Sequence, residues 1–541
     1  MQTHSRLRCT HSVKYRAIRL HGNFTAGETV EGGKFPTAVI AKPDLWTREA
    51  SSAAIRLNQR LIYDDTFDIR TTRNSFHGAA NALLVPTLFQ GVTAMIRYTT
   101  AADRGVSFAS LAAGFLFMTT LHGAEFTLNS RFDMGDGNPG DGVCETASGN
   151  GICTLRAAIQ ETNALSGQDT VYIPSGIYTL SIPGASEDAA AAGDLDIFDD
   201  LVIEGSGAST TIIDAAQLDR VMDLLLGTTL TINDVTLRNG AMTDLGGGLQ
   251  NFGTLEMNRV IIRDNTANSG GGIFNYHDAI IRDSLISGNM ADDLGYTNAD
   301  GGGILNRGSL SIFNSTLSGN KAANMGAAIA STSADLTVLL NSTVSGNEGI
   351  SAIIISNVDT IIRNSTIADN LGLGISYWNY NGIFSSAIGN TIISGNTTDC
   401  APATFPLVSE GYNLVFDGTC GFSQSGDISG IDPMLEALAD NGGITPTRAL
   451  AADSPARDAG DPAGCKDETG SLLSYDQRGE LRPVDGNGDG MAICDIGAVE
   501  AVYTPNSAAS GSGGGGACNP AFYLALLLPF WLVRIYRRYL G

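Results

Sequence analysis

The chain is poor in the residues on which most catalytic and nucleic-acid-binding sites depend. Only 16% of its 541 residues are charged, 7% are aromatic, and the formal net charge is −24. Between Glu125 and Val502 there are two lysines, Lys321 and Lys466, and one histidine, His277. Binding of a polyanion needs clustered Lys and Arg, so nucleic acid is not expected as a partner. The sequence has no CxxC pair either, which argues against a zinc site.

Glycine, in contrast, is abundant, with 66 residues beside 16 prolines. This composition favours tight turns between short apolar strands over long charged helices. An all-β or repeat architecture is therefore expected.

A short β-rich phrase that ends in Asn recurs at intervals of 23 to 31 residues, for example as NRVIIRDN, NSTLSGN and NSTIADN. Its closing residues are Asn239, Asn265, Asn289, Asn320, Asn347, Asn370 and Asn396. The period is too short for a helix pair with its turns, but it fits one coil of three strands. We predict a solenoid in which the closing Asn side chains form a ladder from coil to coil. The NST triplets also match a glycosylation sequon, which is the alternative role of their asparagines.

A glycine-rich phrase lies between the strand phrases, as GGGLQN at Gly246, GGGIFN at Gly270, GGGILN at Gly301 and the degenerate MGAAIA at Met325. Each coil is thus expected to contain a Gly-rich turn, a strand, a polar turn, a further strand and a closing Asn. Inward Val, Ile, Leu and Thr side chains would stack on their equivalents one coil away.

These repeats resemble the right-handed parallel β-helix family shared by pectate lyases, polygalacturonases and many bacterial surface proteins. The resemblance implies an all-β solenoid whose repeats cover residues 181–400. CTLRAA at Cys153–Ala158 resembles the CSLREA motif, from which Thr154 and Ala157 depart. Residues 125–180 are expected to form a CSLREA-like N-terminal cap with the first strands, closed by the amphipathic helix LRAAIQETNAL. Residues 401–502 resemble the C-terminal β-helix module called choice-of-anchor Q.

The two ends of the chain differ from this body. Residues 95–124 have Arg97 and Arg104, an apolar run and then small residues, which is the layout of a secretory signal peptide. We expect Met95 to be the true start and residues 1–94 to be a gene-model extension or disordered. The alternative is a membrane anchor with a cytoplasmic N-terminal segment.

At the other end, a Gly/Ser-rich linker (503–520) precedes an apolar run and a basic cluster (521–541). This order resembles the GlyGly-CTERM sorting signal, which implies a C-terminal transmembrane helix and a sorting protease as partner. A plain membrane anchor is the alternative, and the basic end is expected to stay cytoplasmic.

Cysteine usage agrees with export. The cysteines between the two ends fall into three close pairs, which are Cys144 with Cys153, Cys400 with Cys420 and Cys465 with Cys494. Disulfides in an oxidising compartment are therefore predicted.

One metal site is predicted, for Ca²⁺, which is the only cofactor that the sequence indicates. DGNGDG places oxygen ligands at Asp485, Asn487 and Asp489, as in the first half of an EF-hand loop, and Asp495 can complete a looser site. GDGNPGD, with Asp136, Asn138 and Asp141, is a second and weaker candidate. Ordinary polar turns remain the alternative for both.

No catalytic residue can be assigned, because no nucleophile and base pair, phosphate loop or dinucleotide fingerprint is present. The best case for an enzyme is an acidic cluster with nearby arginines. Its residues would be Asp264, Asp283, Asp292, Asp293 and Asp300, with Arg259, Arg263, Arg282 and Arg307. Solvated turn positions explain the same residues. The aromatic residues Tyr276, Tyr377, Trp378 and Tyr380 are candidates for stacking on sugar rings or for packing beneath loops.

The sequence thus predicts an exported protein at the cell surface, outer membrane or extracellular space of a Gram-negative bacterium. The expected role is binding, adhesion or structure, with a polysaccharide or cell-surface glycan as partner. A polysaccharide lyase or glycoside hydrolase and a passive surface spacer are the alternatives.

Overall fold

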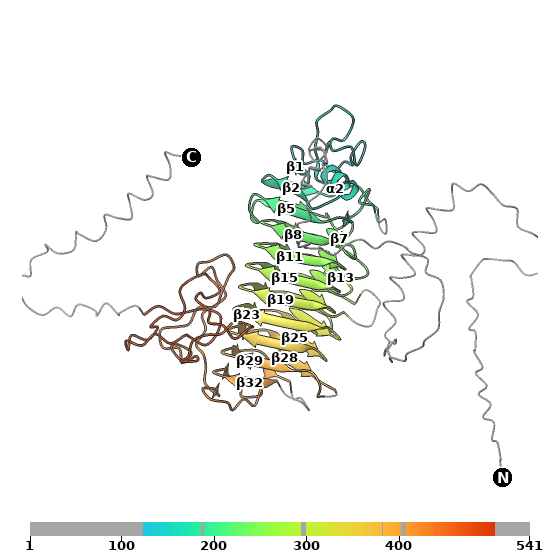
Figure 1. Cartoon of the computed structure of the whole chain (residues 1–541). Helices are drawn as coiled ribbons and strands as arrows, with labels where there is room; N and C mark the ends of the chain where they lie inside the picture. The colour runs from blue at the N-terminus through green and yellow to red at the C-terminus, as the bar shows by residue number, and fades with distance from the viewer. Residues whose placement is uncertain (1–122, 185–188, 294–298, 381, 402–406, 504–541) are drawn as a thin grey trace, which may run out of the picture. The chain divides into compact units, whose positions relative to one another are not determined.

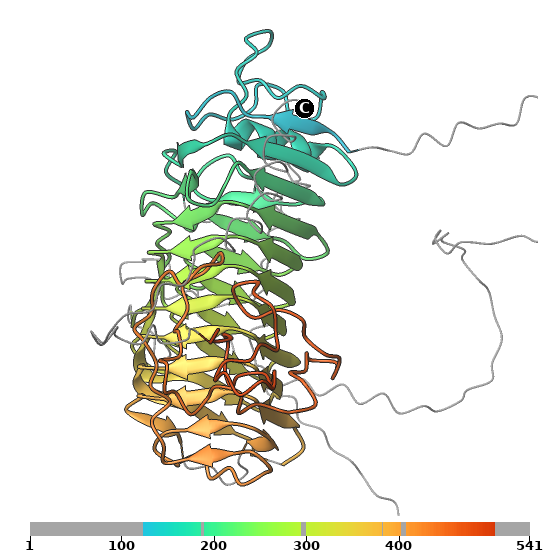
Figure 2. The same ribbon diagram turned by 90° about the vertical axis from the view of Figure 1, so that its left-hand side faces the viewer.

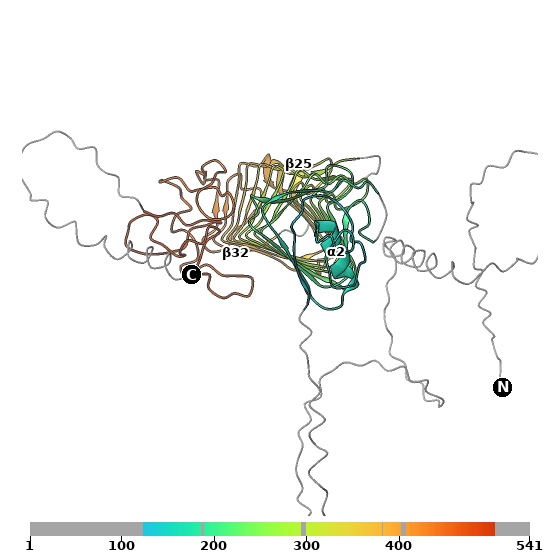
Figure 3. The same cartoon turned by 90° about the horizontal axis from the view of Figure 1, so that it is seen from above.

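The chain forms a parallel β-solenoid of the right-handed type, in which each coil contributes a strand to each of three sheets (Figure 1). The structure is a computed structural model that describes residues 123–184, 189–293, 299–380, 382–401 and 407–503. Every pairing between the named strands is parallel, so the predicted all-β solenoid is confirmed. Seen from above, the coils superpose (Figure 3).

Sheet A contains eleven strands. In the early coils they are the longer strands. They are β1 (Glu125–Thr127), β2 (Asp169–Ile173), β5 (Leu201–Gly205), β8 (Thr229–Asn233), β11 (Thr254–Asn258), β15 (Asp278–Arg282), β19 (Ser309–Phe313), β23 (Leu336–Leu340), β26 (Asp359–Arg363), β29 (Ser386–Gly389) and β32 (Val408–Gly411).

Sheet B also contains eleven strands. They are β3 (Gly176–Thr179), β6 (Thr211–Asp214), β9 (Thr236–Arg238), β12 (Ile261–Arg263), β16 (Leu285–Ser287), β20 (Thr316–Ser318), β24 (Thr343–Ser345), β27 (Thr366–Ala368), β30 (Ile392–Ser394), β33 (Leu414–Val415) and β34 (Ile428–Ser429).

Sheet C contains twelve strands and completes each coil. They are β4 (Leu195–Ile197), β7 (Met222–Leu224), β10 (Leu249–Asn251), β14 (Ile273–Asn275), β18 (Ile304–Asn306), β22 (Ile329–Thr332), β25 (Glu348–Ser356), β28 (Leu371–Trp378) and β31 (Thr398–Cys400), together with β13 (Thr266–Ala267), β17 (Met290–Ala291) and β21 (Lys321–Ala322).

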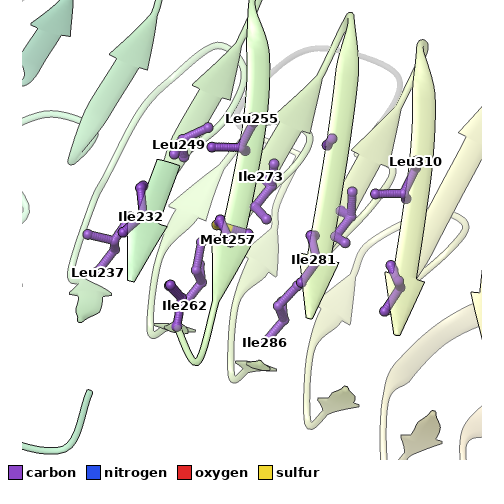
Figure 4. Close-up of a cluster of buried hydrophobic side chains, with 14 of the residues drawn as sticks. Ile232, Leu237, Leu249, Leu255, Met257, Ile262, Ile273, Ile281, Ile286 and Leu310 are labelled. Carbon is purple, nitrogen blue, oxygen red and sulfur yellow. The ribbon is translucent and has the colours of Figure 1, made fainter. Parts of the chain in front are cut away.

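The interior of the solenoid is filled by apolar columns that run from coil to coil (Figure 4). Leu255 of β11 pairs with Leu230 of β8 and Ala279 of β15, while Met257 pairs with Ile232 and Ile281. All six side chains are at most 2% exposed. Because side chains alternate across a strand, the residues between them point outward and are free to vary.

Glycine begins the turn before each sheet C strand for a steric reason. Gly246, Gly270 and Gly301 have φ between +63° and +71°, a region that other residues seldom adopt. A Cβ atom on any of them would also lie 2.6–2.7 Å from a backbone carbonyl oxygen. The repeated glycine phrase is therefore required by the shape of the coil.

The predicted asparagine ladder is confirmed from Asn265 to Asn396. Each side-chain amide donates to the amide oxygen of the next Asn at 2.8–3.0 Å, through Asn289, Asn320, Asn347 and Asn370. The prediction was wrong for Asn239, which lies opposite the residue before Asn265 and donates to Asp214 instead. Gly240 occupies the ladder position, and its N–H donates to Asn265 Oδ1.

Two of the three NST triplets cannot be glycosylated in the folded chain, because Asn341 and Asn364 are at most 1% exposed. The asparagine of the third triplet, Asn314, is half-buried. The threonines of the triplets point outward from sheet B and bind the C-terminal segment, residues 431–503. Thr316 donates to Pro446 O and Thr343 to Gln477 Oε1, both at 2.6 Å.

This C-terminal segment packs along the solenoid, over the later coils (Figure 2). Its own pairing is limited to isolated antiparallel bridges, such as Leu435 with Leu450. Gln477 and Arg482 are nearly fully buried and hold the segment, since Arg482 donates to Asn341 Oδ1 at 2.9 Å. The segment therefore buries the sheet B face of the later coils.

All three predicted disulfides are present: Cys144–Cys153, Cys400–Cys420 and Cys465–Cys494. A helix, α2 (Leu155–Ala164), begins after Thr154, whose side chain accepts a hydrogen bond from Ala157 N. It packs against β2 and β4 at the N-terminal end of the stack. Arg156 is fully buried and pairs with Asp133 at 2.6 Å.

The predictions for the chain ends lie outside the described residues. These are the gene-model extension (1–94), the signal peptide up to residue 122 and nearly all of the linker and apolar tail (504–541). Among the helices that the structure describes, none is long and apolar enough to span a membrane.

Candidate functional site

The outer face of sheet A varies from coil to coil, and in the early coils it is not covered by the C-terminal segment (Figure 2). Its outward side chains lie in rows, because the strands are in register. One row runs from Tyr172 through Glu204, Asn233, Asn258 and Arg282 to Phe313. In β23 the corresponding residue, Leu340, is buried, so the open part of the face ends there.

The middle of this row is connected by hydrogen bonds. Asn233 donates from Nδ2 to Glu204 Oε1 at 2.8 Å, and Asn258 donates to Asn233 Oδ1 at 3.0 Å. The three side chains are half-buried, so their positions are fixed while one side stays open to solvent. Fixed amide and carboxylate groups of this kind can hydrogen-bond to sugar hydroxyls.

A groove of about 490 Å³ opens at the N-terminal end of the row. Tyr172 and Glu204 lie directly opposite each other there, on the neighbouring strands β2 and β5. The ring of Tyr172 is 39% exposed. The full lining is Thr127, Thr170, Tyr172, Ile173, Pro174, Val202, Glu204, Gly205 and Ser206. An exposed ring beside hydroxyl and carboxylate groups is suited to a sugar, which has both apolar faces and polar edges.

At the other end of the row the arginines are engaged with carboxylates. Arg282 pairs with Glu256 at 2.9 Å, and its guanidinium lies 5.2 Å from the centre of the Phe313 ring. Arg259 makes two bonds to Asp234, at 2.8 and 2.6 Å, and these bonds are the main reason that its pKa is raised. Both guanidinium groups are therefore already paired with carboxylates.

The acidic cluster predicted for an enzyme does not assemble on one groove. Asp283 lies in the turn that follows β15, whereas Asp264 follows β12 at the next corner and pairs with Arg263 at 2.6 Å. Asp300 lies at the sheet C corner and accepts hydrogen bonds from Asn324 Nδ2 and Met325 N. Asp292 and Asp293 follow β17 of sheet C, and the last arginine of the set, Arg307, lies between β18 and β19. Residues spread over three corners cannot act on one bond.

A different set of carboxylates does come together. In the described part of the chain, ligand atoms of Asp194, Asp196 and Asp223 lie within 4.8 Å of one another. Arg220 pairs with Asp194 at 3.2 Å and with Asp223 at 3.0 Å, so a cation already occupies the cluster. Burial raises the pKa of Asp194 to about 7. This arrangement is a buried ion network that joins β4, β7 and Arg220.

The residues predicted to bind Ca²⁺ all accept hydrogen bonds from backbone N–H groups. Asp485 accepts hydrogen bonds from Gly488 N and Gly490 N, Asn487 accepts one from Asp489 N, and Asp489 accepts one from Met491 N. Asp495 is fully buried and accepts from Asp458 N and Ala501 N. Burial and the nearby Glu500 raise its pKa to about 7. Ca²⁺ binding at this loop stays a prediction.

The weaker candidate loop is organised in the same manner. Asp136 accepts hydrogen bonds from Asn138 N and Glu145 N, and Asp141 accepts one from Val143 N. Asn138 Nδ2 also donates to Asp141 Oδ2 at 3.0 Å. These side chains shape their own loop, and metal binding here also stays a prediction.

The aromatic candidates separate into packed and exposed residues. Tyr377 belongs to the interior core and is 3% exposed, and Tyr276 packs against Phe252 at 5.5 Å between ring centres. Trp378 and Tyr380 form an edge contact at 6.3 Å, with Tyr380 68% exposed. Trp378 is half-buried at the end of β28 in sheet C, so this pair does not join the row on sheet A.

Sequence reasoning did not identify Tyr172, Glu204, Asn233 or Asn258. They occur at one position of the coil. Asn233 and Asn258 open the recurring phrases NDVTLRN and NRVIIRDN, but Tyr172 and Glu204 belong to no repeated phrase. The available signal was the alternation in five-residue strands such as TLEMN, which indicates an outward polar residue at every second place.

No family model and no curated protein matches the chain. Among solved structures it is similar to the A-module of the mannuronan C-5 epimerase AlgE6 of Azotobacter vinelandii, with 19% identity and a TM-score of 0.31, over 54% of this chain and 81% of that one. It is similar to pectate lyase Pel9A, with 13% identity and a TM-score of 0.38, over 70% and 97% of the two chains. A rhamnogalacturonan lyase shows 13% identity and a TM-score of 0.28, over 66% and 96%. At these identities the similarity concerns the fold alone.

Proposed function

We propose that the protein binds a polysaccharide along the open outer face of sheet A and does not cleave it. The observation that carries the proposal is the groove of about 490 Å³, with the exposed ring of Tyr172 opposite Glu204 and the amide row beginning beside it. A solenoid offers a long straight face of this kind because every coil places one strand in it.

Binding is favoured over catalysis by what the open face contains. Its arginines are paired with carboxylates, and the acidic residues considered for catalysis are spread over three corners. A lyase or hydrolase needs an acid and a base within reach of the same bond. Cleavage is therefore an outcome that the experiment must be able to detect, and a passive spacer is the other alternative.

The test uses the full chain and a panel of acidic, neutral and amino-bearing polysaccharides, with and without Ca²⁺. Both retention of the polysaccharide and new reducing or unsaturated ends are measured. Tyr172→Ala should weaken binding about fivefold, since ring contacts contribute on the order of 1 kcal/mol. The matched control is Tyr475→Ala, which removes an exposed ring from the C-terminal segment. New chain ends would refute pure binding, and equal losses in both variants would refute the sheet A site.

We also propose that the protein is exported and held at the cell surface of a Gram-negative bacterium. The three disulfides support an oxidising compartment. In this proposal α2 acts as the CSLREA-like cap, residues 95–124 are removed as a signal peptide, and residues 521–541 act as a sorting signal or membrane anchor. Sequencing the N-terminus of the exported protein tests the first step, because a mature chain that retains residues before Met95 contradicts it.

A further inference from the structure

Resting on the proposed function, we infer that the groove at Tyr172 and Glu204 selects a polysaccharide with free amino groups and rejects polyuronates. The inference goes beyond the proposed binding because it names the charge of the ligand. It depends on the charges of the open face and on the environment of Glu204.

The open face and the turn that borders it carry an excess of carboxylates. From β1 to β19 the acidic residues at outward positions or in the turn to sheet B are Glu125, Glu204, Asp234, Glu256, Asp278 and Asp283, against the guanidinium groups of Arg259 and Arg282. Each of these two guanidinium groups is paired with a carboxylate. His277 also lies beside Asp278, at 3.2 Å. A polyuronate laid on this face would therefore meet like charges.

Glu204 forms no ion pair within 4 Å among the described residues, and Arg259 acts on it only at longer range. Its Oε1 accepts a hydrogen bond from the Asn233 amide, which is neutral, so its charge is not cancelled by that contact. The outward neighbour of Glu204 on the other side is Tyr172, and both side chains line the groove. A nearby cation, Arg131, donates to Ser175 O at 2.9 Å in the turn that follows β2. The groove thus combines a carboxylate with an aromatic ring.

An ammonium group bound in this groove would gain two interactions. The first is a charge-assisted hydrogen bond to Glu204, which is stronger than a hydrogen bond between neutral groups. The second is a cation–π contact of the ammonium with the face of the Tyr172 ring. A neutral sugar gains neither charge term, and a uronate carboxylate at the same place is repelled by Glu204. Amino sugars are therefore preferred over neutral sugars, and neutral sugars over uronates.

The experiment compares three hexamers on the full chain by calorimetry at pH 5.5, where free amines are protonated. They are glucosamine hexamer, N-acetylglucosamine hexamer and galacturonic acid hexamer, the last with and without Ca²⁺. We expect glucosamine hexamer to bind tightest and to weaken as salt is raised, because the attraction is between exposed charges. Glu204→Gln should weaken its binding about tenfold and weaken the binding of N-acetylglucosamine hexamer by clearly less, because only the amino sugar loses a charge interaction. The matched control, Glu436→Gln, removes an exposed carboxylate from the C-terminal segment and should leave all three unchanged.

The outcomes separate this inference from the function on which it rests. Equal binding of the amino and acetylated hexamers, or no effect of Glu204→Gln, overturns amine selection while leaving glycan binding in place. Tighter binding of the uronate hexamer, with or without Ca²⁺, also overturns it and points to a cation bridge between carboxylates. Failure of all three hexamers and of every polysaccharide in the panel overturns the proposed function itself.

Discussion

Removing one rung of the asparagine ladder should destabilise the solenoid far more than removing a similar bond on its surface. Asn320 is fully buried and lies in the middle of the ladder. Its Nδ2 donates to Ile286 O at 2.9 Å and to Asn347 Oδ1 at 3.0 Å. Its Oδ1 accepts from both the backbone N–H and the Nδ2 of Asn289, at 3.1 and 3.0 Å.

The Asn320→Ala substitution leaves two buried backbone groups without these partners. The Asn289 N–H loses its acceptor and the Ile286 carbonyl loses its side-chain donor, whereas Asn289 Nδ2 keeps its bond to Ile262 O. An unsatisfied buried polar group costs about 1–3 kcal/mol. We therefore expect a loss of about 4 kcal/mol in the free energy of unfolding. Local opening should also be detected, since each coil contacts only its neighbours.

The matched control is Asn258→Ala. Asn258 donates to another asparagine at 3.0 Å as Asn320 does, but it lies half-buried on the open face of sheet A, where water can replace the lost bond. Its substitution should cost less than about 1 kcal/mol. Urea unfolding measures the global effect, and amide hydrogen exchange around Asn289 measures the local one. Similar losses in the two variants would show that burial of the ladder does not matter.

Three further predictions concern charge, the disulfide and the C-terminal segment. Burial raises the pKa of Asp194 and Asp495 from 3.8 to about 7, so the native state holds protons that the unfolded chain has released. The contribution of these two groups to the free energy of unfolding, up to about 4 kcal/mol each, is complete below about pH 4 and is lost as the pH rises through 7. The urea midpoint should therefore be lower at pH 8 than at pH 5.5. Asp194→Asn should reduce that difference. Replacing Cys465 and Cys494 by Ser opens a loop of 29 residues and should cost about 3.5 kcal/mol, measured as faster proteolysis of the C-terminal segment. Gln477→Leu removes buried hydrogen bonds to Thr316, Thr343 and Thr445 and should release the same segment to protease. A variant that remained fully protected would exclude the Gln477 contacts as the main attachment of the segment.

The fold could be predicted because every coil buries the same positions. Leu255 and Met257 point inward in β11 as their partners do in β8 and β15, so the apolar pattern repeats with the period of the coil. The asparagine ladder was predicted from the same regularity. The one error in that prediction, at Asn239, arose because this repeat is shorter by one residue. Arg238 pairs with Arg263, but one residue separates Arg263 from its closing asparagine and none separates Arg238 from Asn239.

The candidate site could not be predicted, because its residues are those in which the coils differ. The recurring phrases align Asn233 with Asn258, but Glu204 becomes their neighbour only through the register of the strands, which no phrase in the sequence records. The burial of the outer face of sheet B by the C-terminal segment could not be predicted either. The contact of Thr316 with Pro446 joins residues 130 apart, and a repeated threonine gives no indication of which segment will accept its hydrogen bond.

The interior of the solenoid, the outer face of sheet B and the outer face of sheet A thus have different roles. This division explains where the proposed binding site lies. The interior columns and the asparagine ladder stack the coils and must repeat. The outer face of sheet B repeats its threonines in the later coils, where they attach the C-terminal segment. On the outer face of sheet A, from β2 to β19, neither stacking nor docking fixes the residue type. A solenoid can change its ligand by substitutions on that face without loss of the stacked core, so the charges there, and Glu204 first among them, are expected to determine which polysaccharide is bound.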